Sequence, residues 1–145
     1  MANILIVDDR DHVRQVLLEE FLDDGYGVAS IDGSKPVKEL VSLLNPDLII
    51  MDVRLKGRDG IGLVRDIKRM NERLPIVIFT SHQRFKEDMR LTEVEGFILK
   101  SSSFDELKQV VADVLKNKAD EMQSKMKGVS LPEVKKFNTL AACMV

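Results

Sequence analysis

The sequence lacks the residues that indicate secretion, a zinc site or a membrane anchor. Its one cysteine, Cys143, excludes an intramolecular disulfide and lies one position too close to the end for a prenylation box. Together with His12 and His82 it matches no zinc-binding spacing. No apolar run approaches the roughly 20 residues that span a bilayer, and no basic and then apolar leader is present. We therefore expect a cytoplasmic protein without membrane contact.

An excess of charge of one sign is also lacking. The chain has 22 Lys and Arg against 24 Asp and Glu, a formal net charge of −2, so we expect no direct nucleic-acid ligand. There is no P-loop, and the glycines in residues 57–62 have the reverse of the dinucleotide-binding spacing. The 145 residues fit one domain. We expect it over residues 1–118, with a helix extension and C-terminal tail over 119–145.

Short apolar runs recur along the chain, and segments of helical period separate them. The first, third and fourth runs do not alternate with polar residues, which is typical of parallel strands buried on both faces. The second run is weaker and is predicted mainly from its position. The predicted strands cover residues 4–7, 28–31, 48–51, 76–79 and 97–99.

The helical segments carry recognisable start and stop signals. Ser34 is expected to cap the second helix, and Ser103 with Glu106 forms a capping box before the fifth. The apolar stripes run over residues 13–21, 37–44, 61–70, 85–94 and 104–115, of which the fourth is shorter. This alternation predicts a doubly wound α/β domain, with a five-stranded parallel sheet and helices on both faces.

Polar residues with complementary chemistry follow the predicted strands. Asp8 and Asp9 follow the first strand, Asp52 the third, Thr80 the fourth and Lys100 the fifth. In open α/β sheets, ligands bind outside the carboxyl ends of the strands. We therefore expect these five residues to converge on one edge of the sheet.

The three aspartates indicate a site for a divalent cation and a phosphoryl group. Crowded carboxylates repel one another unless a cation lies among them, and hard oxygen ligands suit Mg²⁺. Asp52 is the better nucleophile, while Lys100 and Thr80 would contact phosphoryl oxygens. Taken singly, each residue has a plainer explanation as a helix cap, a turn residue or a solvated side chain. Their joint placement favours the phosphoryl site.

At these segments the sequence resembles the receiver domain of bacterial response regulators. The resemblance covers residues 3–118 and rests on the segments 4–9, 47–52, 75–81 and 97–100. It implies the flavodoxin-like strand order 2-1-3-4-5. It also implies an aspartyl-phosphate module with at most autophosphatase activity, phosphorylated by a histidine kinase or a phosphotransfer protein.

The resemblance assigns a role to each site residue. Asp52 is implied to be the phospho-acceptor and, with Asp9 and the backbone carbonyl of Arg54, a ligand of Mg²⁺; Asp8 acts largely through water. Thr80 and Phe97 are the implied switch pair. They would repack the face made by the fourth helix, the fifth strand and the fifth helix for an unknown output partner, or for a second copy in a homodimer.

Three departures from the family pattern keep other interpretations open. Lys56 and Ser101 stand where many members have proline, so the usual cis bond after Lys100 is not expected. The stretch 80–100 is about two residues shorter than is common. These departures motivate the alternative of a phosphate-independent interaction module. A phosphatase is disfavoured because Arg54 occupies the place of its second carboxylate. We expect either a stand-alone receiver or the front part of a longer regulator.

Overall fold

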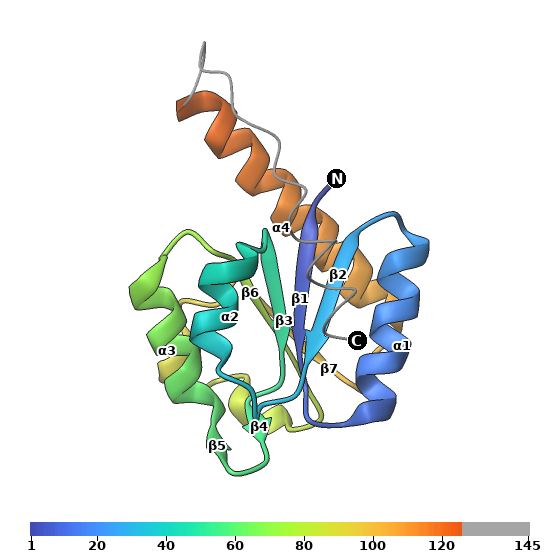
Figure 1. The fold of residues 1–145 in the computed structure, drawn as a ribbon, viewed down its shortest axis with the longest axis vertical. Helices are drawn as coiled ribbons and strands as arrows, with labels where there is room; N and C mark the ends of the chain where they lie inside the picture. The colour runs from blue at the N-terminus through green and yellow to red at the C-terminus, as the bar shows by residue number, and fades with distance from the viewer. Residues whose placement is uncertain (126–145) are drawn as a thin grey trace.

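Five parallel strands form the central sheet (Figure 1). The computed structural model describes residues 1–125 of the protein. The sheet strands follow one another in the order β2-β1-β3-β6-β7, which confirms the expected 2-1-3-4-5 topology. They are β1 (Asn3–Val7), β2 (Gly27–Ile31), β3 (Leu48–Met51), β6 (Ile76–Thr80) and β7 (Gly96–Leu99).

Helices cover both faces of this sheet. Helices α2 (Val37–Leu44) and α3 (Gly60–Met70) lie on one face, and α1 (Asp11–Asp23) and α4 (Phe104–Lys125) lie on the other (Figure 1). Alternate residues of β1 therefore enter two separate hydrophobic clusters, Leu5 on the α2–α3 side and Ile4 on the α1–α4 side. Burial on both faces explains why the central strands are continuous apolar runs.

The ends of the helices follow local chemistry, with one wrong prediction. Ser103 accepts the Glu106 N–H at 3.3 Å, as expected for the start of α4. Ser34, however, does not cap α2; it bonds to the Asp32 carboxylate instead. Helix α2 begins after Pro36, whose fixed φ and missing N–H are tolerated at a helix start.

The prediction of a fourth helix over residues 85–94 is wrong. Between β6 and β7 the chain forms two 3₁₀ turns, η1 (Gln83–Phe85) and η2 (Met89–Leu91). Asp88 accepts the Arg90 N–H at 2.9 Å, a local bond that competes with helix formation. Phe85 packs on the α2–α3 cluster, but Met89 is 80% exposed, so the apolar positions form no continuous helical stripe.

A short hairpin that the sequence analysis did not predict follows β3. Strands β4 (Arg54–Leu55) and β5 (Arg58–Asp59) pair in antiparallel fashion, with Leu55 opposite Arg58. Gly57 takes a φ of +68° in the turn between them. Asp59 then caps α3 by accepting the Gly62 N–H at 3.1 Å. The hairpin lies directly beyond the carboxyl end of β3 (Figure 1).

Helix α4 continues beyond the sheet (Figure 1). Its buried residues, Leu107 and Val111, lie in its first half, whereas Met122 near its end is 38% exposed. The helix reaches Lys125; the predicted tail, with Met126 and Cys143, lies outside the described residues. No peptide bond in residues 1–125 is cis. The described helices also include none with the length and apolar character needed to cross a membrane.

Candidate functional site

Hydrogen bonds that extend past the strands bring the predicted site residues to one edge of the sheet. The Asp52 N–H donates to the Val7 carbonyl at 3.1 Å, and the Lys100 N–H donates to the Thr80 carbonyl at 2.8 Å. The ladder therefore continues one residue beyond β3 and β7. It aligns the residues that follow these strands with the carboxyl ends of β1 and β6.

Lys100 joins the two buried aspartates of this edge. Its Nζ lies 2.7 Å from Asp8 Oδ2 and 2.8 Å from Asp52 Oδ2. The side chains are 10%, 3% and 4% exposed, respectively, so all three charges are largely removed from water. With both carboxylates ionised, the three groups carry a net charge of −1 in a place largely removed from water.

Local backbone amides occupy the other oxygens of these aspartates. Asp8 Oδ1 accepts the Arg10 N–H at 2.9 Å, and Asp52 Oδ1 accepts the Arg54 N–H at 3.0 Å. Burial nevertheless raises the pKa of Asp8, because desolvation outweighs the opposing effects of Lys100 and the Arg10 amide. The charged form of Asp8 is therefore costly without a further cation.

The Asp9 carboxylate has a different partner from those of Asp8 and Asp52. Its Oδ2 accepts the backbone N–H of Lys56, in the β4–β5 turn, at 2.7 Å. Within residues 1–125, no three His, Cys, Asp or Glu side chains are grouped closely enough to hold a metal ion. The structure thus brings together Asp8, Asp52 and Lys100, whereas the Asp9 carboxylate is bonded to the hairpin.

The donor set suits Mg²⁺ in its chemistry. Asp8, Asp9 and Asp52 offer hard carboxylate oxygens, the ligands this ion prefers, and Arg54 lies beside the Asp52 carboxylate. The buried excess of negative charge at Asp8 and Asp52 is of the kind that a divalent cation relieves. Asp9 Oδ2 also accepts the Lys56 amide, a contact with the hairpin that the other two carboxylates do not make.

Thr80 and Phe97 lie on neighbouring strands and face the same side of the sheet. Phe97 pairs with Ile78, and Thr80 is two residues beyond Ile78 on the same strand. Thr80 is fully buried, and its Oγ1 accepts the His82 N–H at 3.4 Å. Phe97 is half-buried against the α2–α3 cluster. Both residues thus adjoin the segment that forms 3₁₀ turns.

Two contacts at the site escaped the sequence analysis. Arg14 donates from Nη1 to the Asp8 carbonyl at 2.6 Å and pairs with Asp11 in the first turn of α1. The Asp11–Arg14 spacing of three on a helix is a signal that could have found it. The Lys56–Asp9 bond joins residues 47 positions apart through a backbone amide, and nothing in the residue types signals it.

Comparison with known proteins supplies a family for this geometry. Residues 4–112 match the family model described as the response regulator receiver domain. The regulatory protein AtoC of Escherichia coli is 27% identical over 77% of this chain and 25% of its own length. The sporulation initiation phosphotransferase F of Bacillus subtilis is 28% identical over 81% of this chain and 96% of its own length.

A solved structure adds the three-dimensional match. The response regulator TrrA of Thermotoga maritima, in complex with Mg²⁺–BeF, superposes with a TM-score of 0.73 at 30% identity, over 79% of this chain and 99% of TrrA. TrrA is also known in complex with the histidine kinase ThkA, with a TM-score of 0.71 at 31% identity over the same shares. The chain thus spans nearly all of TrrA but only a quarter of AtoC.

Proposed function

The chain belongs to the response regulator receiver family of two-component signalling, and we propose that Asp52 is its phospho-acceptor, with Mg²⁺ bound beside it. Receivers of this family are phospho-acceptor modules. The observation that carries the proposal is the buried bridge of Lys100 between Asp8 and Asp52. It brings a carboxylate and an ammonium group together at the edge where parallel sheets bind ligands.

The proposed step is an in-line transfer to one carboxylate oxygen of Asp52. The donor is a phosphohistidine of a kinase or phosphotransfer protein: an O–P bond forms, the N–P bond breaks, and the imidazole leaves with the electron pair. Lys100 then releases Asp52 and pairs with a phosphoryl oxygen. The Thr80 hydroxyl, whose oxygen accepts the His82 N–H, donates its hydrogen to another phosphoryl oxygen. Mg²⁺ would neutralise charge on the phosphoryl group.

The relatives support these partners. TrrA was solved with Mg²⁺–BeF and with a histidine kinase, and at 30% and 31% identity it supports a Mg²⁺-dependent kinase reaction here too. The output surface is proposed to comprise residues 81–95, β7 and α4, with Phe97 as the switch residue beside Thr80. Residues 81–95 of this surface contain 3₁₀ turns in place of the expected helix. The output partner would therefore contact a surface of different shape from the one implied by the family resemblance. Autophosphatase activity, homodimerisation and a cytoplasmic location stay predictions.

The test is a titration with beryllofluoride and Mg²⁺, followed by ¹H–¹⁵N NMR. We expect chemical-shift changes centred on residues 52, 80, 97 and 100, and their complete loss in Asp52→Asn. Asp66→Asn, which removes an exposed carboxylate on α3, is the matched control and should respond as the wild type. An unchanged wild-type spectrum at millimolar Mg²⁺ would contradict the proposal.

A second candidate function is a phosphate-independent interaction module. It is favoured by the Lys56–Asp9 bond, which gives the third carboxylate a partner outside the bridge of Asp8, Lys100 and Asp52. Mg²⁺ titration separates the candidates: saturable binding between micromolar and millimolar supports the phospho-acceptor, and its absence supports the module.

A further inference from the structure

The β4–β5 turn has a geometry that places the Lys56 amide without strain. Leu55 and Arg58 pair across it, so Lys56 and Gly57 are its two central residues. Gly57 has a φ of +68°, whereas Lys56 is not among the described residues with positive φ. This combination corresponds to a type II turn, in which the first central position also suits proline.

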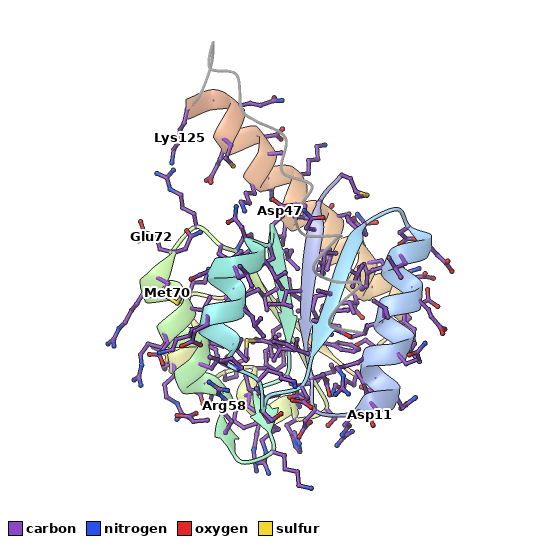
Figure 2. The ribbon with its side chains drawn as sticks, in the orientation of Figure 1. Asp11, Asp47, Arg58, Met70, Glu72 and Lys125 are labelled. Atoms are coloured by element: carbon purple, nitrogen blue, oxygen red, sulfur yellow. The ribbon has the colours of Figure 1, made fainter. Side chains whose placement is uncertain are left out.

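Contacts independent of Asp9 hold this hairpin in place. The Leu55 side chain is buried in the α2–α3 cluster. Arg58 donates from Nη1 to the carbonyls of Gly33 and Lys35, at 2.9 and 2.8 Å, and so fastens the hairpin to the loop before α2. Figure 2 shows Arg58 at this end of the sheet, with Asp11 near the start of α1. The position of the Lys56 amide is therefore determined mainly by the hairpin.

The Asp9 carboxylate differs from its neighbours in where it is bound. Asp8 and Asp52 each accept a hydrogen bond from the backbone N–H two residues later in the chain. Such a bond is local and does not depend on the position of any other loop. Asp9 instead accepts an amide from a separate loop, at 2.7 Å. Of the three aspartates, Asp9 is thus the one whose carboxylate is bonded to the hairpin.

We propose that the Lys56 backbone amide is a positioning group that latches Asp9 onto the hairpin, so that the site must release this bond when it takes up Mg²⁺. The inference rests on the proposed Mg²⁺ site. Binding of the cation is then coupled to the hairpin: the Lys56 N–H loses its carboxylate partner as Asp9 turns toward Asp8 and Asp52. Any change that removes the N–H leaves Asp9 free and tightens Mg²⁺ binding.

Two substitutions at one position test the latch. Lys56→Pro removes the N–H in a turn that suits proline, and Lys56→Ala removes the side chain but keeps the N–H. Isothermal titration with MgCl₂ should give Lys56→Ala the wild-type affinity and Lys56→Pro an affinity about tenfold higher, the equivalent of one charge-assisted hydrogen bond no longer broken. Equal affinities of the two variants would overturn the latch.

The wild-type protein provides a second measurement that does not depend on the folding of a variant. On saturation with Mg²⁺, the Lys56 amide proton should shift upfield and exchange faster with solvent, while the Gly62 amide, held by Asp59, should stay unchanged. A Lys56 amide unaffected at saturation would overturn the latch alone. Absence of Mg²⁺ binding in every variant would overturn the latch and the proposed cation site together.

Discussion

Two lysines at opposite edges of the sheet pair with carboxylates, and only one of these pairs is electrically balanced. Lys68 lies at the amino edge, where the parallel strands begin. It donates to the Leu74 carbonyl at 2.9 Å and pairs with Glu95. Glu95 in turn accepts the Ile76 N–H at 2.8 Å. Figure 2 labels Glu72 and Asp47 at this edge, opposite Arg58 and Asp11.

The two edges differ in net charge and in the hydrogen-bond partners of the lysine ammonium group. Lys68 faces one carboxylate and two carbonyls, so its three donors are used and the pair is neutral. Lys100 faces two buried carboxylates and leaves a negative charge in excess. The excess of negative charge at the carboxyl edge agrees with the proposed binding of a cation there. The same residue types thus form a neutral pair at one edge and a site with an excess of negative charge at the other.

Removal of the amino-edge lysine should have the largest effect on stability. Lys68→Met leaves Glu95 without its cation and two carbonyls without a donor, and we expect a loss of about 2–4 kcal/mol, reduced because the Glu95 side chain is 31% exposed. Urea denaturation measures it. Lys38→Met breaks an exposed pair with Asp66 and should cost under about 0.5 kcal/mol. Equal losses would contradict the structural role of Lys68.

Neutralisation of one carboxylate at each edge should change stability in opposite directions. Asp52→Asn removes the excess charge while keeping an acceptor for the Arg54 N–H, so we expect a gain of about 1 kcal/mol at pH 7. Glu95→Gln uncharges a balanced pair and should cost about 1–2 kcal/mol. Both are read from thermal or urea unfolding. A loss in Asp52→Asn as large as that in Glu95→Gln would mean that the two edges do not differ in charge balance.

A third lysine, Lys118, should have the smallest effect on stability, and this effect should depend on pH. Lys118 Nζ donates to the Asp47 carbonyl at 3.2 Å, and burial lowers its pKa below the ordinary 10.5. A lowered folded-state pKa means that the unfolded chain binds more protons in the window below 10.5, so stability rises with pH there. Wild-type stability relative to Lys118→Met should therefore increase slightly from pH 8 to 10. A decrease in this relative stability over the same pH range would contradict a lowered pKa of Lys118 in the folded protein.

The elements of the sheet were predictable because burial leaves a direct pattern in the sequence. Ile4 and Leu5 enter different clusters, so β1 had to be continuously apolar, and the same pattern located β3 and β6, whereas β2 was predicted mainly from its position. Four helices followed in the same way from their apolar stripes. The fourth predicted helix failed because Asp88 forms a local bond to Arg90, and the Ser34 cap failed because Asp32 is its partner. Both errors arose where short polar side chains compete for backbone groups.

The sequence by itself determined the parallel α/β architecture and the strand ends at which Asp8, Asp52, Thr80 and Lys100 lie. It did so because strand length, burial and the residue after each strand are local properties. The strand order came from the family resemblance. Only the tertiary structure decided that Lys100 joins aspartates 92 and 48 positions away, and that Asp9 binds the Lys56 amide instead. These contacts depend on sheet register and on the hairpin after β3, which no periodicity encodes.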